Sequence, residues 1–541
     1  MQFMTKPMKM RKLFLSFALA VCAVAALAQG SSDAVFRDKM TSAVMKVYDD
    51  HLAQNPNDYN ILFARAHQYY YNGDYTAALA DVNQALMLTP KGDKELRFDE
   101  YILRARISDA RRDFTSELAD LHLAQELEPK SLACTDLIAK ANLKSGDLNA
   151  AENAFKTILR AEPMNYDAMY GMAQVEQARG NAAAAIEHVT KATELFRVEP
   201  QVYVNRADIY TRQGNIDAAV LDLLNGMAVG NGGNAAQRLF DLSDTHYDDV
   251  MRSLADIAGQ SVDGGGIYRY LRANIAMDHC RYSDALADLN NVMRTRSYDS
   301  PTVYFNTGRC CFELEQYAEA ARLADQALAM DSSQPEYYLL KSQALYYAGD
   351  GGNVDAAMEW LDRCSLVDAQ YVPMLMAKAA LYSRQGQDET ALSYLNAALD
   401  QEPDNAEALL SRATLLQRLG QIQQADQDMN TMLMLSDDVY DLKGFALYAL
   451  GHNSEAMRWL QQITSNSIPG GEAFYYAAML MANRGDNFKA MEYITRAIEL
   501  GYGSRHRLER EELLPATLAP LRSDQGFKML LEKASPNFNH Q

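Results

Sequence analysis

Histidine, cysteine and clustered carboxylates are the residue types that most often carry catalysis or bind metals, and here none of them forms a recognisable site. No two of the nine histidines stand at i and i+4, the spacing that places a pair of metal ligands on one helical face. Phosphate-binding glycine loops, H-E-x-x-H, G-x-S-x-G and EF-hand loops are also absent. The residues therefore predict no enzymatic activity, no catalytic residues, no metal and no cofactor.

Five cysteines follow residue 28, and two interpretations of them remain open. An odd number without any C-x-x-C spacing does not resemble a disulfide framework, which favours small buried residues. The alternative is one disulfide, joining Cys280 to Cys310 or Cys311. Formal net charge is −20, from 51 Lys and Arg against 71 Asp and Glu. A chain this acidic lacks the basic surface that nucleic-acid binding requires, so we expect no nucleic-acid partner.

The chain repeats itself with a period of 34 residues. A pattern G-[DNQ]-x-x-x-A recurs, as in Gly73 to Ala78 and Gly146 to Ala151. Along most of the chain, the last positions of consecutive copies are 34 residues apart or close to it. Apolar residues recur at helical spacing on both sides of the glycine, which predicts two helices per repeat with the glycine ending the first. One such hairpin cannot bury its apolar face alone, so the repeats must stack.

A charged pair follows the same period, with a basic residue at position 7 of a repeat, counting from Tyr59, and Asp 16 residues later. We interpret it as an ion pair between the two helices of a repeat, forming a structural ladder. Lys341/Glu359 fits if residues 349–352 contain a two-residue insertion, whereas Lys378/Tyr394 and Lys443/Trp459 depart from the rule. The five Arg/Asp pairs are Arg65/Asp81, Arg104/Asp120, Arg206/Asp222, Arg272/Asp288 and Arg412/Asp428.

These repeats resemble the tetratricopeptide repeat (TPR) family over about residues 57–500. The matching residues are small or aromatic at fixed positions, with proline at the end, although Leu62 and Leu375 stand where the family commonly has Trp. The resemblance implies an all-α fold, a right-handed superhelical solenoid of helix-turn-helix repeats. Two repeats that carry the pattern contain Tyr69, Tyr75, Ala85 and Pro90, and Ala379, Tyr382, Ala398 and Pro403.

Interruptions of the period suggest how the chain is divided. Glycine and asparagine clusters flank one degenerate unit and are the candidate joints. The predicted segments are a signal peptide at 1–28, a capping helix at 31–56, a first array of about five repeats at 57–231, a degenerate repeat at 232–266, a second array of about seven repeats at 267–500, and a C-terminal cap and tail at 501–541.

The first 28 residues predict export. Four basic residues precede an apolar run from Leu13 to Leu27, and Ala26-Leu27-Ala28 is a small-x-small cleavage signal. The competing interpretation is a membrane anchor, but fifteen residues of helix rise only about 22 Å, short of the roughly 30 Å hydrocarbon core. We expect an exported protein, periplasmic or envelope-associated, with no transmembrane span in its mature chain.

In TPR proteins the first helix of each repeat lines the concave groove, which implies where a partner binds. Aromatic residues recur there at positions 5, 12 and 13, and His67, Arg106 and Lys140 form a basic row at position 9. The aromatic residues either pack in the core or grip a polypeptide, and the basic row is either a solvated face or an anion-binding row. The candidate contact residues are Tyr70, Arg106, Lys140, Tyr170, Tyr270, Phe305 and Tyr346.

The predicted function is that of an exported scaffold that binds polypeptide segments of other proteins in the concave groove of a TPR solenoid. A scaffold that assembles an envelope complex would belong to the same functional class. The alternative from a different class is an accessory subunit or enzyme of an envelope complex that processes glycans or peptides.

Overall fold

The computed structural model describes residues 45–262, 264–348, 353–435, 440–465, 471–508 and 517–534. These residues form helices and turns, and no strand occurs among them. The all-α repeat fold expected from the sequence is therefore confirmed. The chain divides into two compact units, Met1–Leu242 and Ser243–Gln541.

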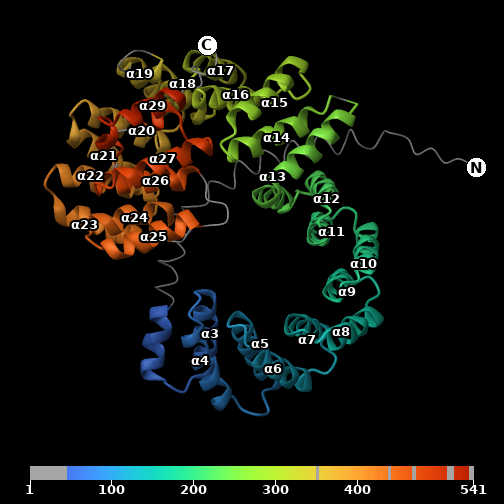
Figure 1. Ribbon diagram of the computed structural model, residues 1–541. Helices are drawn as coiled ribbons and strands as arrows, with labels where there is room; N and C mark the ends of the chain where they lie inside the picture. Colours follow the sequence, from blue (N-terminus) through green and yellow to red (C-terminus); the bar gives the residue numbers. More distant parts are fainter. Residues whose placement is uncertain are drawn as a thin grey trace, which may run out of the picture. The chain divides into compact units, whose positions relative to one another are not determined.

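The first unit is a curved row of helix pairs, which Figure 1 shows in blue to green. Helical residues 45–54 precede it, within the predicted capping helix. Each pair packs against the next through its second helix and the first helix of its neighbour. The pairs are α3 (Tyr59–Tyr71) with α4 (Tyr75–Leu88), α5 (Lys94–Ala110) with α6 (Phe114–Leu127), α7 (Leu132–Ser145) with α8 (Leu148–Ala161), α9 (Tyr166–Ala178) with α10 (Ala182–Leu195), and α11 (Pro200–Arg212) with α12 (Ile216–Ala228).

The second unit continues with seven pairs. They are α14 (Gly266–Asp278) with α15 (Tyr282–Thr295), α16 (Pro301–Glu313) with α17 (Tyr317–Met330), α18 (Pro335–Tyr347) with α19 (Val354–Val367), α20 (Val372–Arg384) with α21 (Asp388–Gln401), α22 (Ala406–Arg418) with α23 (Ile422–Leu433), α24 (Tyr440–Ala449) with α25 (Asn453–Ser465), and α26 (Gly471–Asn483) with α27 (Asn487–Glu499). The short α28 (Arg505–Leu508), the 3-10 helix η3 (Ala519–Leu521) and α29 (Gln525–Ala534) follow.

The recurring G-[DNQ] dipeptide is explained by the turn inside each pair. The glycine adopts a left-handed conformation after the first helix, as at Gly146, where φ is +90°. The next residue caps the second helix, since the Asp147 carboxylate accepts a hydrogen bond from the amide of Ala150 at 3.0 Å. Among the turns that the structure describes, three place another residue in this left-handed conformation, namely Arg112, Cys280 and Glu315, with φ of 59°, 55° and 60°.

The degenerate segment, labelled α13 (Ala235–Gln260), consists of two helices that meet at a kink, where His246 has non-helical geometry. It replaces the glycine turn of an ordinary repeat with a kink. The division between the two compact units falls inside this segment, between Leu242 and Ser243. The glycine clusters predicted as joints lie on either side of this segment.

Several predictions lie wholly or partly outside the described residues. These are the signal peptide at 1–28, the start of the capping helix, the insertion at 349–352, part of the cap at 509–516, and the tail at 535–541. Within the part of the chain that is described, no helix combines the length and apolar character needed to cross a bilayer. The five cysteines beyond residue 28 are free, and all except Cys280 are buried. The buried interpretation therefore holds for four of them.

The predicted ladder of ion pairs is confirmed in its five Arg/Asp members. In each, the guanidinium makes two parallel hydrogen bonds to the carboxylate, at 2.6 Å for both bonds in Arg206–Asp222. The hydrogen bond to Asp222 raises the pKa of Arg206 despite burial. The other bidentate pairs are Arg65–Asp81, Arg104–Asp120, Arg272–Asp288 and Arg412–Asp428.

The prediction of a Lys341/Glu359 pair is wrong. Lys341 binds Asp325 of the preceding repeat, and its ammonium lies 4.5 Å from the centre of the Trp360 ring. Lys378 behaves in the same way, binding Asp362 at 2.8 Å and lying 5.6 Å from the ring centre of Tyr394. The lysine ammonium is a point charge and cannot make the two parallel hydrogen bonds of a guanidinium. In these two repeats the lysine instead contacts an aromatic ring and a carboxylate of the preceding repeat.

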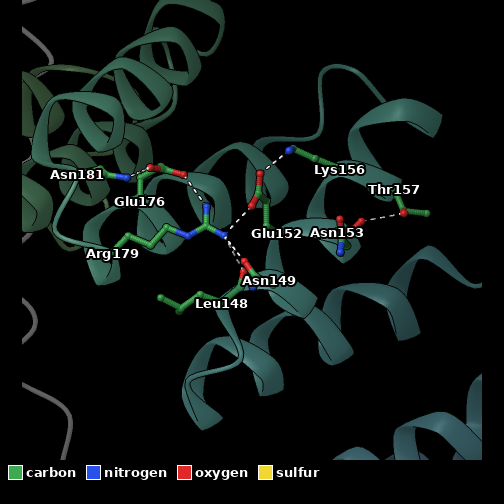
Figure 2. A network of polar contacts seen from close by, with 9 residues as sticks. All are labelled: Leu148, Asn149, Glu152, Asn153, Lys156, Thr157, Glu176, Arg179 and Asn181. Atoms are coloured by element: carbon green, nitrogen blue, oxygen red, sulfur yellow. Dashed lines mark hydrogen bonds and ion pairs between the residues drawn. The ribbon is translucent and has the colours of Figure 1, made fainter.

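Further ion pairs and hydrogen bonds join one repeat to the next. Figure 2 shows Arg179, just after α9, reaching Glu152 of α8 at 2.6 Å and Glu176 of its own helix at 3.0 Å. Asn181 also donates to Glu176, at 2.7 Å. The network therefore fixes the third repeat against the fourth. Its charged and amide groups bind one another.

Candidate partner-binding surface

The first helix of each pair lies on the inner side of the curve within each unit. Neighbouring first helices contact each other directly, as α7 does with α9 and α16 with α18. Across the described ranges, the second helices of neighbouring repeats do not approach one another as closely. A row that is tighter along one set of helices curves toward that set. Helices α3, α5, α7 and α9 therefore line the concave side of the first unit.

An aromatic cluster begins this concave face on α3, and we call Phe63, His67, Tyr70 and Tyr71 the α3 cluster. The Phe63 and His67 rings meet edge to face with centroids 4.8 Å apart, and His67 stacks on Tyr71 at 6.1 Å. Tyr70 contacts Tyr71 at 5.7 Å. Tyr71 is 71% exposed, whereas the other three are partly buried. The cluster therefore exposes one aromatic ring, that of Tyr71, which contacts the partly buried rings beside it.

The basic row at position 9 is not uniform. Arg106 is exposed, and among the described residues it has no carboxylate within ion-pair distance. Lys140 is bound to Asp136 of its own helix at 2.6 Å. Burial and the nearby Arg106 charge lower the pKa of His67, so this histidine favours its neutral form. Of the three residues, Arg106 is the one that offers a cation to a ligand.

Tyr170 lies further along the same face, on α9. Its ring stacks on that of Tyr166 with centroids 6.5 Å apart and an angle of 2° between the planes. Tyr166 is tied to the next repeat because its hydroxyl accepts a hydrogen bond from Asn205. Burial raises the pKa of Tyr170, which remains a neutral hydroxyl. Tyr170 is half-buried.

Two of the three candidate residues in the second unit are core residues. Tyr270 is 5% exposed, and its hydroxyl accepts a hydrogen bond from Asn306 at 3.0 Å. Tyr346 is 6% exposed. Both side chains therefore pack between repeats, the first of the two interpretations left open for the aromatic positions. Phe305 remains half-buried, with its ring 4.9 Å from that of Tyr337 and below Arg309.

One group of side chains in the second unit has the composition of a metal site. Asp244, Asp278 and His279 each have a ligand atom within 4.8 Å of the others. The His279 Nε2 atom already lies 3.1 Å from the Ser243 hydroxyl, and both aspartates are exposed. Such a group is common on a surface with this many carboxylates, and we assign no metal to it.

Two open pockets lie beside ion pairs of the ladder. One, of about 310 Å³, surrounds Arg104 and Asp120, and another, of about 410 Å³, surrounds Arg412 and Asp428. In both, the arginine is also bound to an asparagine of the preceding repeat, Asn83 at 2.8 Å or Asn396 at 3.0 Å. The polar groups at their centres are therefore satisfied, and these pockets are features of repeat packing.

Comparison with known families matches tetratricopeptide repeats over much of both units. The matched residues are 137–196, 170–236, 270–335 and 312–364, with further matches at 372–405 and 394–427. The chain therefore contains tetratricopeptide repeats, as the sequence pattern predicted.

Curated relatives are distant. Tetratricopeptide repeat protein 16 of Homo sapiens is 23% identical over 338 residues, which are 62% of this chain and 30% of the relative. The corresponding protein of Macaca fascicularis gives the same values. The chain thus spans less than a third of the length of the relatives it matches.

Solved structures that this chain is similar to have low sequence identity to it. They include the APC/C hetero-tetramer Cut9–Hcn1, at 14% identity and a TM-score of 0.32 over 83% of this chain and 88% of that one. Yeast Tom70 has 15% identity and a TM-score of 0.33 over 82% and 92%. Naa15/Naa10 bound to HypK-THB has 12% identity and a TM-score of 0.33 over 98% and 99%.

Proposed function

We propose that this protein is a non-catalytic scaffold whose first unit binds a polypeptide segment of another protein along its concave face. The observation that carries the proposal is the α3 cluster, in which the 71% exposed Tyr71 ring contacts the partly buried rings of His67 and Tyr70. Tyrosine rings are suited to such contacts, because they bury a large apolar area while their hydroxyls remain hydrogen-bonded.

The charge beside the α3 cluster indicates what kind of segment fits. Arg106 stands on the next first helix as a cation without a carboxylate partner among the described residues, and its charge is felt at His67. A segment with apolar or aromatic side chains and one carboxylate would satisfy both features. Lys140 is less suited to this role because Asp136 already neutralises it.

Site-specific photo-crosslinking in the cells that make the protein tests this assignment. A photoreactive residue in place of Tyr71 or Arg106 is expected to capture the same partner, and one in place of His122, an exposed residue of the second helix α6, is expected to capture none. Equal capture from His122, or no capture from the concave positions, would refute the assignment.

With the captured partner purified, Arg106→Ala should weaken binding by about fivefold or more, and Tyr71→Ala by a similar factor. Lys140→Ala serves as the matched control because its charge is already paired, and it should have little effect. If affinity fell with Lys140→Ala but not with Arg106→Ala, the row would bind in a different way from the one proposed.

Export completes the proposal and rests on the sequence of residues 1–28 alone. Cell fractionation together with the N-terminal sequence of the mature protein tests it, and the expected mature chain begins after Ala28. A full-length protein retained in the cytosol would refute export without bearing on the binding face. Turnover of a glycan or peptide by the purified protein would instead favour the enzymatic alternative.

A further inference from the structure

The second unit makes a contact between repeats that are far apart in the sequence. Segment 501–508, which follows α27, reaches residues 191 to 225 positions earlier, at α15 and the end of α16. In a solenoid each repeat normally contacts only its neighbours. This contact therefore joins the last repeat of the unit to its first two and is additional to ordinary repeat packing.

An ion pair between Arg507 and Glu313 lies at the centre of the contact. The Arg507 guanidinium donates to the Glu313 carboxylate at 2.8 Å, and the side chains are only 18% and 16% exposed. The Ser504 hydroxyl donates to the second oxygen of Glu313 at 3.2 Å. The guanidinium also lies 3.9 Å from the ring centre of Tyr502 and 3.4 Å from the Tyr282 hydroxyl. Burial acts to lower the pKa of Arg507, but Glu313 and the tyrosines outweigh it and raise this pKa.

The backbone of the segment fits closely against the turn between α14 and α15. Gly501 has φ +85°, and a Cβ atom there would lie 2.4 Å from the carbonyl oxygen of Cys280. Only glycine is therefore accommodated, on grounds of both conformation and space. The segment is also held from its own side, because the Tyr475 hydroxyl of α26 donates to the Arg507 carbonyl at 2.7 Å.

We propose that residues 501–508 form a clasp, and that the second unit has a closed state and an open state according to whether this clasp is engaged. While the clasp is closed, the largely buried charges of Arg507 and Glu313 compensate each other. Removing one partner leaves the other charge buried and uncompensated, which favours the open state, where that charge is hydrated. The repeats themselves are held by their own neighbours, which lets the clasp open without unfolding them. Opening frees the concave face, where Phe305 lies, to change its curvature, and a partner that fits one curvature selects one state.

Cys280 is a natural probe of the clasp. It is the one partly accessible cysteine among the described residues, and Gly501 lies directly against it. The rate at which a thiol reagent alkylates Cys280, located by peptide mass spectrometry, should therefore report the open population. We expect Glu313→Gln and Arg507→Gln each to raise this rate by about tenfold or more.

Matched variants separate clasp opening from loss of structure. Arg496→Gln removes an exposed ion pair of α27 with Glu499 and should leave the Cys280 rate unchanged. The exchanged pair Glu313→Arg with Arg507→Glu should return the rate toward that of the native protein. Buried Cys310, Cys311 and Cys364 should remain unreactive in every variant. Unchanged Cys280 reactivity in both single variants, or a parallel rise at the buried cysteines, would overturn the proposal.

Discussion

Glu117 on α6 occupies the position where the other matching repeats have alanine, and replacing it should stabilise the first unit at neutral pH. The alanines there, such as Ala78 and Ala151, are fully buried. Glu117 is 5% exposed, and its Oε2 atom is buried without a hydrogen-bond partner. Burial and the charge of Asp109, opposed by Lys144, raise the pKa of Glu117 from its ordinary 4.5 to about 7.

The raised pKa sets the size and sign of the effect. The unfolded chain releases the Glu117 proton as pH rises through 4.5, whereas the folded chain keeps it until about pH 7. The stabilisation from this protonated carboxyl is therefore complete below pH 4.5 and is lost as pH rises to 7. A shift of this size corresponds to about 3 kcal/mol. We expect Glu117→Ala to exceed the native protein by about 2–3 kcal/mol at pH 8 and to lose that advantage near pH 4.5.

Hydrogen exchange of the α5–α7 amides, measured over a pH series and corrected for intrinsic rates, follows the stability of this region. Tryptophan fluorescence is unsuitable because both tryptophans, Trp360 and Trp459, lie in the second unit. Glu117→Gln separates charge from side-chain volume, and Glu126→Gln on the exposed face of α6 is the control. A stability difference between Glu117→Gln and the native protein that does not change with pH would refute the reasoning.

Two further predictions follow from the repeat geometry. For the ladder, the losses in free energy of unfolding caused by Arg206→Ala and Asp222→Ala, measured singly and together by denaturant unfolding, should be non-additive by about 1–3 kcal/mol. The reason is that each single change leaves a largely buried charge without its partner. Strictly additive losses would show that the pair is not coupled. For the turns, Arg112→Gly should stabilise the first unit by about 1 kcal/mol, since glycine adopts the left-handed conformation without the cost that arginine bears; an unchanged or lower denaturation midpoint would contradict this.

Local patterns in the sequence were enough to predict the repeating helix pairs. Apolar residues at helical spacing and the G-[DNQ] dipeptide act within a few residues, the first through helix packing and the second through a turn whose conformation glycine favours. Five ladder pairs were predicted for the same reason, because their 16-residue spacing lies within one repeat. The Lys341 rung was mispredicted because its true partners are Trp360 and, in the preceding repeat, Asp325.

The surface residues depended on tertiary packing. Tyr70 and Tyr270 are both aromatic residues of first helices, yet Tyr270 is 5% exposed whereas Tyr70 is only partly buried. Tyr71 stands at position 13 of its repeat, but its spacing gave no sign that it would be the most exposed of these rings. Exposure is a property of what the next repeat places beside a side chain.

The sequence by itself determined the unit of construction, since a 34-residue helix pair is specified by interactions between residues close together in the chain. Only the tertiary structure decided how the stack of helix pairs curves within a unit, because small rotations between neighbouring pairs add up over many repeats. That accumulation brings Arg507 onto Glu313. No periodic pattern relates those two residues. They are in contact because the stacking of seven helix pairs brings the end of the second unit back to its first two repeats.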